Sequence, residues 1–540
     1  MMVQKPEVTQ YPDGSRIWSH SFDTFSVKVY QPVCDLPEQI INFGFEAPYL
    51  LWLEETSLSG DEAKTLADRN GLAAIAAEHA STVVFVSPAD SWKNADESLF
   101  VELIHHSRIH QYHRDGYAEL NNRFTHQVEG YAIRGAIFRT CLYGKGEAAD
   151  YIASHLLKTI EGDGLWGPAD VTPAVCVLEA LSVAPVIERK DIPIVSAGNT
   201  DEINTIIRAG AEHSLIVETA DYRELYRGFT GKWLRWVGQL QPAVDFDALG
   251  MTEEPAWITV PTSPDNRGDD AGTVEHAIGY IAWYNRELPT KKNVPLLLCF
   301  HGGGDSAMYI SEVSEWYRVA HDHGFFLVCV ENHMNSTATE MTLLLEHLKT
   351  KYPVDPEKIY ASGFSMGGCK SWDLMQEYPL LFAGLAPMDA TFELGLNAFG
   401  QPAPKEINRN IPVPVFYAGG EITPLPELPF QAQKCYDRID WLLRVNDTEK
   451  RYEVSFDEHE QWTEPVWGVT GDRILRYRDE SRNSVLTVHE FRSRNGEVLT
   501  QLASVSGQGH ECRHHTCEYA WRFISRFRRK ADGRLLRDEP

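Results

Sequence analysis

The sequence contains no apolar run of about 18 residues, the length that crosses a bilayer, anywhere in its 540 positions. Its first eight residues also lack the apolar segment of a secretory signal peptide. Positive charge is scarce, because 50 lysines and arginines stand against 77 aspartates and glutamates and leave a net charge of −27. A chain of this charge repels polyanions, so we expect neither nucleic acid nor a membrane surface as a partner.

Cysteine is also sparse, with nine residues in the chain. Several of them, such as Cys299 and Cys329, lie inside apolar runs, where a thiol packs as a small hydrophobic side chain. This usage differs from that of a disulfide-stapled secreted domain and predicts reduced thiols in a cytoplasmic protein. The apolar fraction of 43% suffices for large cores, the length predicts more than one domain, and a homo-oligomer is compatible with this composition.

The sequence does contain a Gly-x-Ser-x-Gly motif, with Gly363, Ser365 and Gly367, between an apolar run and a helix-like segment. This context predicts a nucleophile elbow, a sharp strand-to-helix turn that exposes the serine hydroxyl. Glycines at both ends let the turn close without side-chain clashes. The motif alone arises easily by chance in a long chain, so the prediction that Ser365 is a nucleophile depends on its surroundings.

A second glycine-rich motif lies about sixty residues upstream. The apolar run 294–300 is typical of a strand buried on both faces, and it ends in His301, Gly302, Gly303 and Gly304. Glycines there let backbone N–H groups converge on one point, as an oxyanion hole requires. Strand-like and helix-like segments alternate from this run to Ser365, which predicts a parallel sheet with both motifs at the carboxyl ends of strands.

An activated serine also needs a base and an acid. An apolar strand-like run leads into a glycine-flanked loop that carries His510, which is the predicted base. For the acid we predict Glu421, the first carboxylate after the apolar run 412–417. Asp389 and Glu427 are the alternatives.

These motifs resemble those of the α/β-hydrolase superfamily over residues 275–530, and in particular the esterases grouped with polyhydroxybutyrate depolymerases and feruloyl esterases. The resemblance implies a serine, acid and histidine triad with no metal or organic cofactor. It also implies an oxyanion hole made by the backbone N–H groups of Met366 and Gly303, with Gly304 as a further donor. The acid of the family is usually an aspartate a few residues past a small-residue turn, and the glutamate at 421 departs from that pattern.

The first half of the chain repeats the pattern of the second. An apolar run at 138–143 enters Gly144, Lys145 and Gly146 at the place of an elbow, but glycine stands where the nucleophile should be. Glu54 and Glu55 replace the turn of histidine and glycines, and carboxylates repel an oxyanion.

We therefore predict two α/β-hydrolase-like domains in tandem, each a mostly parallel sheet flanked by helices. Residues 1–245 would be a degenerate, non-catalytic domain and residues 246–540 the catalytic one, joined by a proline- and charge-rich linker near 245–266. The alternative for the first half is an unrelated α/β domain.

Two further segments carry distinct expectations. Residues 445–500 alternate charged with aromatic or aliphatic side chains, which predicts a β-rich insertion that either extends over the active site or adds to the sheet. Downstream, a group of histidines and cysteines suggests zinc: His510, Cys512, His514, His515 and Cys517. Their spacing fits no closed structural site, so we expect no metal.

The leading prediction is a cytoplasmic serine esterase that forms an acyl-enzyme on a small soluble ester, for example an acylated or hydroxycinnamoylated sugar. A serine peptidase or amidase would use the same triad. A non-catalytic binding protein is the alternative from another class.

Overall fold

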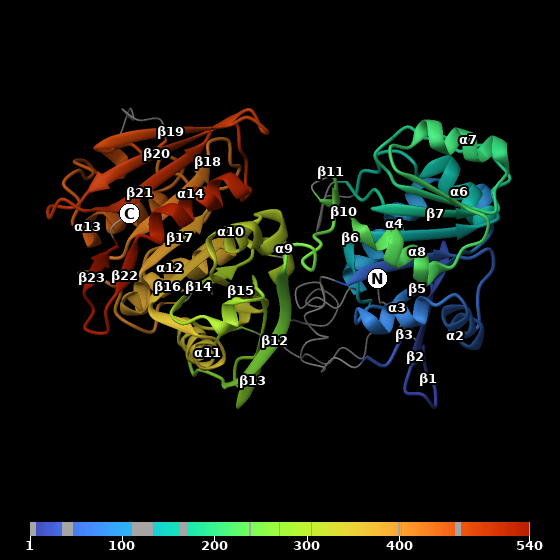
Figure 1. Cartoon of the computed structure of the whole chain (residues 1–540), viewed down its shortest axis with the longest axis horizontal. Helices are drawn as coiled ribbons and strands as arrows, with labels where there is room; N and C mark the ends of the chain where they lie inside the picture. The colour runs from blue at the N-terminus through green and yellow to red at the C-terminus, as the bar shows by residue number, and fades with distance from the viewer. Residues whose placement is uncertain are drawn as a thin grey trace. The chain divides into compact units, whose positions relative to one another are not determined.

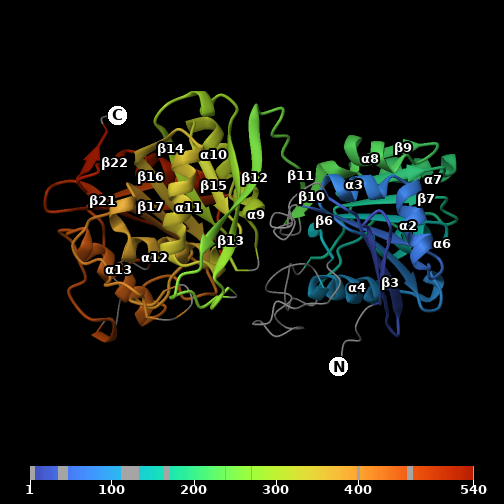
Figure 2. The same cartoon turned by 90° about the horizontal axis from the view of Figure 1, so that it is seen from below.

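The chain forms two compact units, Met1–Val244 and Asp245–Pro540, each with a sheet and a core of its own. The structure, a computed structural model of the full chain, is drawn in two views (Figure 1 and Figure 2). It describes residues 7–34, 47–110, 133–162, 170–236, 239–268, 270–303, 305–397, 400, 402–458 and 466–538.

The C-terminal unit is built on a ten-stranded sheet in the order β12-β13-β15-β14-β16-β17-β18-β21-β20-β19. The strands from β15 to β21 pair in parallel, while those at both edges pair antiparallel. The strands span Met251–Pro261 (β12), Glu275–Asn285 (β13), Val294–Phe300 (β14), Phe326–Val330 (β15), Val354–Phe364 (β16), Gly384–Met388 (β17), Val415–Gly420 (β18), Arg473–Asp479 (β19), Ser484–Arg492 (β20) and Val498–Val505 (β21).

Helices cover both faces of this sheet (Figure 1). Three of them, α11 (Ala338–Lys351), α12 (Met366–Glu377) and α13 (Gln433–Val445), bury apolar side chains in one large core with alternate residues of the strands. On the other face α10 (Trp316–His323) packs against α14 (His514–Ile524), and α9 (Ala307–Val313) precedes α10. A short hairpin of β22 (Phe527–Arg529) and β23 (Leu535–Arg537) ends the unit.

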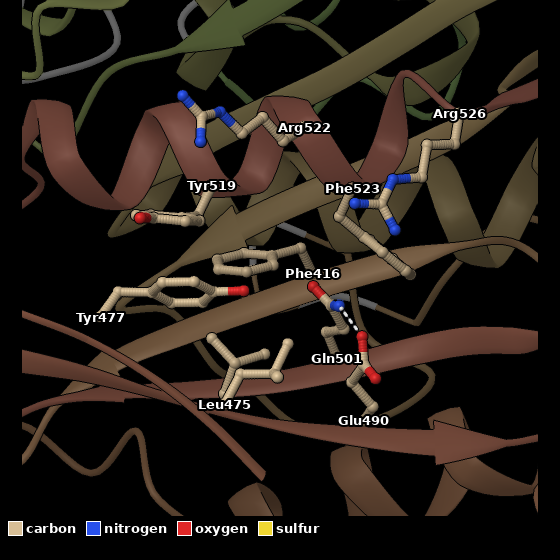
Figure 3. A pocket seen from close by; sticks show the side chains of 10 residues that line it. Phe416, Leu475, Tyr477, Glu490, Gln501, Tyr519, Arg522, Phe523 and Arg526 are labelled. Atoms are coloured by element: carbon tan, nitrogen blue, oxygen red, sulfur yellow. Dashed lines mark hydrogen bonds between the residues drawn. The ribbon is translucent and has the colours of Figure 1, made fainter. Parts of the chain in front are cut away.

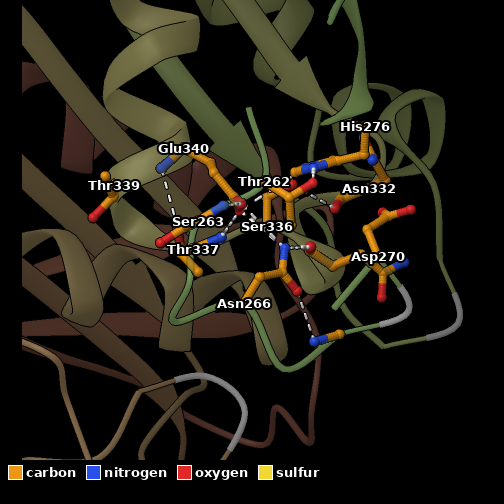
Figure 4. Close-up of polar contacts among 12 residues, drawn as sticks. Thr262, Ser263, Asn266, Asp270, His276, Asn332, Ser336, Thr337, Thr339 and Glu340 are labelled. Carbon is orange, nitrogen blue, oxygen red and sulfur yellow. Dashed lines mark hydrogen bonds and ion pairs between the residues drawn. The ribbon is translucent and has the colours of Figure 1, made fainter. Parts of the chain in front are cut away.

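The predicted linker near 245–266 is wrong over half of its length, because residues 251–261 form the edge strand β12. The segment that follows is fixed to α11. The buried Glu340 carboxylate accepts hydrogen bonds from the backbone N–H of Ser263 (2.7 Å) and from Nδ2 of Asn266 (3.1 Å), as Figure 4 shows. Asn266 also donates to the carbonyl of Asn335 (2.7 Å).

The predicted β-rich tract 445–500 supplies β19, β20 and the start of β21. These strands extend the main sheet at one edge, so they are additional sheet.

The N-terminal unit contains a nine-stranded sheet in the order β1-β2-β3-β5-β4-β6-β7-β8-β9. Its strands span Glu7–Gln10 (β1), Arg16–Ser21 (β2), Phe25–Gln31 (β3), Pro48–Leu53 (β4), Val83–Pro88 (β5), Ala136–Lys145 (β6), Val175–Glu179 (β7), Ile194–Ala197 (β8) and Ser214–Val217 (β9). Its helices span Gly60–Arg69 (α2), Leu72–Glu78 (α3), Glu97–His110 (α4), Glu147–His155 (α6), Asp201–Gly210 (α7) and Tyr222–Gly228 (α8), and a hairpin of Trp233–Trp236 (β10) and Gln239–Pro242 (β11) follows.

The two units share the arrangement of their central strands and differ at the edges, because β20 and β19 extend the C-terminal sheet antiparallel whereas the N-terminal sheet ends in the parallel strand β9. In each, an antiparallel hairpin leads into a parallel sheet in which two successive strands exchange places, β5 with β4 and β15 with β14. In each, helices bury both faces, and the N-terminal unit accordingly has two apolar cores. The predicted fold class, two mostly parallel sheets flanked by helices, is confirmed.

No helix in the described part of the chain combines the length and the apolar character that crossing a membrane requires.

Candidate active site

Ser365 stands between the end of β16 and the start of α12 with φ 53° and ψ −120°. An L-residue rarely adopts this conformation, and it is held here by a backbone hydrogen bond from the Ser365 N–H to the carbonyl of Met388 (3.0 Å). Strained backbone at a strand-to-helix turn is the geometry of a nucleophile elbow.

The glycines around Ser365 are required by close backbone approach. A Cβ on Gly363 would lie 2.2 Å from the carbonyl oxygen of Gly367, and a Cβ on Gly367 would lie 2.1 Å from that of Phe300. Both distances are far below van der Waals contact. The second contact also packs the elbow against the end of β14, where the upstream glycine motif begins.

The predicted oxyanion donors Gly303 and Met366 lie side by side, since a Cβ on Gly303 would be 3.3 Å from Cγ of Met366. Met366 is the first residue of α12, where backbone N–H groups have no partner within the helix. The loop that carries Gly303 begins at His301, whose Nε2 is 2.5 Å from the carbonyl oxygen of Glu331. The third predicted donor, Gly304, lies outside the described residues.

The imidazole of His510 lies beside the elbow. Its ring centroid is 4.6 Å from that of Phe364, the residue before Ser365. Its Nδ1 is 2.5 Å from Oε1 of Glu427, and that glutamate is only 2% exposed. A buried carboxylate on Nδ1 leaves Nε2 as the atom that can take a proton.

The structure does not bring Glu421, the predicted acid, to His510. The backbone N–H of Glu421 donates to the carbonyl oxygen of Val505 in β21 (3.1 Å), and Oε1 of Glu421 accepts a hydrogen bond from Oγ of Ser504 (2.8 Å). Its side chain is therefore turned to the neighbouring strand. The chain runs six residues further before a carboxylate, Glu427, meets the imidazole.

The other alternative, Asp389, also lies in this cluster. One side-chain atom each from Asp389, Glu427 and His510 fall within 4.8 Å of one another. Burial, reinforced by the charge of Glu427, raises the pKa of Asp389 well above its ordinary value. Asp389 directly follows β17 with a left-handed φ of 44°.

Sequence reasoning missed Asp305, although it directly follows the glycine motif. Burial raises the pKa of this carboxyl to about 7, and nearby His510 opposes the rise. Asp305 is thus a second titratable group that senses the charge of the imidazole. Its position next to a predicted oxyanion loop was the only signal available in the sequence.

The histidines and cysteines suggested for zinc do not gather. Within the described ranges no three of the five place ligand atoms together, and the only close contact between them that involves sulfur joins the buried Cys512 and Cys517 (Sγ to Sγ, 3.5 Å).

A cavity of about 170 Å³ lies between α14 and the strands β18 to β21. Figure 3 shows Tyr477 and Tyr519 at its wall, stacked with ring centroids 3.8 Å apart, and Gln501 donating to Glu490 (2.8 Å). No candidate catalytic residue lines it, so this cavity is separate from the site at Ser365.

The N-terminal unit contains the same elbow without a side chain. Gly146, between β6 and α6, has φ 58° and ψ −128°, which nearly repeats the backbone of Ser365. The carboxylate of Glu55 fills the space, because a Cβ on Gly146 would lie 2.3 Å from Oε1 of Glu55. That oxygen accepts a hydrogen bond from the N–H of Glu147 (3.0 Å), the position equivalent to Met366.

Comparison with known proteins places these features among esterases. No family model matches the chain. The chain is 27% identical over 137 residues to a bifunctional acetylxylan esterase/xylanase of Neocallimastix patriciarum, a match that covers 24% of this chain and 19% of that protein. It is 25% identical over 115 residues to poly(3-hydroxyalkanoate) depolymerase C of Paucimonas lemoignei, covering 18% and 28%. The matches thus span less than a third of either relative.

Two solved structures are also similar. The acetyl xylan esterase from Aspergillus awamori matches at 12% identity and a TM-score of 0.32, over 50% of this chain and 98% of that one. A fluorophosphonate-binding serine hydrolase of Staphylococcus aureus matches at 17% identity and a TM-score of 0.26, over 36% and 87%. The resemblance indicated by the motifs is confirmed by the two sequence relatives and by the sheet topology: this chain is similar to esterases of the α/β-hydrolase superfamily.

Proposed function

We propose that the C-terminal unit hydrolyses carboxylic esters, with Ser365 as nucleophile, His510 as base and Glu427 as acid. The observation that carries the proposal is the elbow at Ser365 beside an imidazole whose Nδ1 is 2.5 Å from a buried carboxylate. A serine hydroxyl is a weak nucleophile at neutral pH, and this arrangement is what activates it.

The reaction proceeds through an acyl-enzyme. His510 takes the hydroxyl proton of Ser365 while Oγ of Ser365 bonds to the ester carbonyl carbon. The N–H groups of Met366 and Gly303 stabilise the oxyanion that forms. The intermediate collapses as the C–O bond to the alcohol breaks and His510 returns its proton to the leaving oxygen. Water, deprotonated by His510, then releases the acid and restores the serine.

We propose the N-terminal unit as a non-catalytic copy of the same fold. Gly146 offers no nucleophile. The Glu55 carboxylate accepts the hydrogen bond of the Glu147 N–H, the group that would otherwise bind an oxyanion. A negative charge there opposes ester chemistry.

For the substrate we propose a small soluble ester, such as an acylated or hydroxycinnamoylated sugar. The acetylxylan esterase activity in one relative's name supports an acylated sugar. The nine cysteines, all free thiols, support a reducing cytoplasmic location.

Covalent labelling tests the proposal directly. A fluorophosphonate probe should label the full chain, and hydrolysis of p-nitrophenyl acetate should accompany the labelling. Both should be lost in Ser365→Ala and kept in Ser481→Ala, which alters an exposed turn serine of the same unit. An unlabelled wild-type chain, or labelling that survives Ser365→Ala, would overturn the proposal.

The same protein distinguishes an esterase from a peptidase or amidase. A panel of p-nitrophenyl esters should be hydrolysed, and aminoacyl anilides should not. Preference for the anilides would replace the esterase proposal with its closest alternative.

A further inference from the structure

Two carboxyl groups, from two different strands, converge behind one imidazole. Asp389 follows β17, and Glu427 lies in the segment after β18. One atom of each lies within 4.8 Å of the other and of a ring nitrogen of His510. A serine, acid and histidine triad needs one carboxylate, so the second group requires an explanation.

Asp389 is tied to both segments that carry the other two residues. Its Oδ1 accepts a hydrogen bond from the N–H of Gly420 at the end of β18 (2.8 Å), and its Oδ2 accepts one from the N–H of Glu511 (3.2 Å). Glu511 is the residue next to His510. The side chain of Asp389 therefore holds the loop of the base against the strand that leads to the acid.

Both carboxyl groups are 2% exposed. No lysine or arginine pairs with either of them within the described residues, and their one cationic neighbour is His510 when it is protonated. Two like charges at this separation in a dry site cannot both persist, because each disfavours the ionisation of the other. The other titratable groups that face Asp389 are Tyr417 of β18 and Cys512 of the His510 loop, and neither supplies positive charge.

We propose that Asp389 is a positioning residue that stays protonated, shares its proton with Glu427 and so leaves a single negative charge behind His510. The inference rests on the proposed function, since it assigns a role within that triad. Burial and the charge of Glu427, which raise the pKa of Asp389, agree with it. One charge has a consequence for the base: two carboxylates would hold the imidazole in its protonated form, in which it cannot accept the serine proton.

The variants Asp389→Asn and Asp389→Ala separate charge from positioning. Asparagine keeps a neutral side chain at position 389: its amide can donate to Glu427, and its oxygen can accept from one of the two backbone N–H groups that Asp389 pairs, while the other N–H loses its acceptor. We expect Asp389→Asn to lose less of kcat/KM on p-nitrophenyl acetate than Asp389→Ala does, with the acidic limb of its pH profile unchanged. Alanine leaves the buried N–H of Gly420 and the half-buried N–H of Glu511 unpaired, and kcat should fall about 10- to 100-fold with little change in KM.

The pH profile is the measurement that a purely structural role would not move. If Asp389 were ionised in the enzyme, removing its charge would shift the acidic limb to lower pH by about 1 unit or more. Such a shift in Asp389→Asn overturns the proposal, and so does full activity in Asp389→Ala. Near-ultraviolet circular dichroism establishes that each variant is folded.

An infrared measurement keeps this proposal separate from the proposed function. With aspartate side chains labelled with ¹³C, the wild-type chain at pH 7 should show a stronger protonated-carboxyl stretching band than Asp389→Asn, which keeps the contribution of Asp305 with its pKa of about 7. The absence of this difference overturns the inference even if the enzyme is an esterase. Its presence in a chain that hydrolyses no ester would leave the protonated pair intact and reject only its role in a triad.

Discussion

Ser365 and Gly146 share one backbone conformation and differ by a hydroxymethyl group. At Gly146 the positive φ carries no penalty, because glycine has no Cβ. At Ser365 the same φ stores strain of about 1–3 kcal/mol, which the hydrogen bond to Met388 and the packed helix α12 must offset. The N-terminal unit thus shows what this elbow becomes when the nucleophile is removed.

The strain at Ser365 can be measured by comparing two substitutions that remove the hydroxyl. We expect Ser365→Gly to be more stable than Ser365→Ala, although both are inactive. Glycine relieves strain of about 1–3 kcal/mol and loses about 0.4–1 kcal/mol through the freedom of the unfolded chain, so the net gain is about 1 kcal/mol. Denaturant unfolding of the two variants measures it.

The control for this comparison is Ser481, a turn serine that is absent from the residues with positive φ. There glycine should be no more stable than alanine. Equal stabilities of the two Ser365 variants would show that the elbow is unstrained.

Asp305 makes the stability of the C-terminal unit depend on pH. Its pKa is about 7 in the folded chain, against an ordinary value of 3.8, so the folded state binds its proton more tightly than the unfolded state. The free energy of unfolding therefore falls as pH rises from about 4 to about 7 and loses nothing more from this group above that. Asp305→Asn removes this loss, so the variant should gain melting temperature over wild type at pH 8 and none at pH 4.

The exposed Asp457 provides the matched control. Asp457→Asn should shift the melting temperature equally at both pH values. A pH-independent effect of Asp305→Asn would mean that the carboxyl is solvated in the folded chain.

At the scale of elements, buried strands were predictable and loops were not. The run 294–300 coincides with β14, because a strand buried on both faces needs an unbroken apolar sequence. The residues 251–261 were mistaken for a linker because they contain Pro255 and Pro261. A proline removes a backbone donor, which a central strand cannot lose, but β12 is an edge strand that pairs with one neighbour, β13, among the described strands.

The acid illustrates the same limit. Sequence order indicated the segment after β18, but the local pattern could not tell how far the chain runs before a carboxylate lies beside His510. Glu421 is still paired in the sheet, and Glu427 lies in a segment without helix or strand. Loop geometry depends on tertiary contacts such as the bond from Tyr417 to the carbonyl of Glu427 (2.9 Å), which carry no periodic signature.

The N-terminal elbow yields a prediction about its own unit. Gly146→Ser should destabilise it by about 1–3 kcal/mol, because serine must adopt the positive φ of 58° there and Oε1 of Glu55 must move away from the new Cβ. The double variant Gly146→Ser with Glu55→Gly should recover part of this loss. In a Ser365→Ala background, the single variant should remain unlabelled by fluorophosphonate, since the carboxylate fills the site.

Gly228 serves as the control, because a Cβ there meets nothing within 4 Å. Gly228→Ala should leave the thermal unfolding of the unit nearly unchanged. Labelling of Gly146→Ser in the Ser365→Ala background would show that the N-terminal elbow retains a working base and that its assignment as non-catalytic is mistaken.

At the scale of the whole molecule, one topology serves two units with different chemistry. The order of the central strands and the exchange of two of them are kept in both, while in the described residues the glycine turn, the proposed nucleophile and the imidazole paired with a carboxylate belong to the C-terminal unit. Apolar cores need only residues of the right pattern and volume, whereas a catalytic site needs particular atoms at particular places. The fold therefore persists through changes that remove a site.

The C-terminal unit contains a complete candidate site and a core of its own. All residues of the proposed triad and of its described oxyanion donors lie within Asp245–Pro540, and the core that supports them draws on residues of that unit alone. We therefore expect a fragment of residues 245–540 to fold and to hydrolyse p-nitrophenyl acetate with kcat/KM close to that of the full chain. The fragment 1–244, tested in parallel, should fold and remain unlabelled by fluorophosphonate. If circular dichroism shows that the C-terminal fragment is folded but the fragment is inactive, the N-terminal unit must contribute to the site. The N-terminal unit would then support catalysis and would not be independent of it.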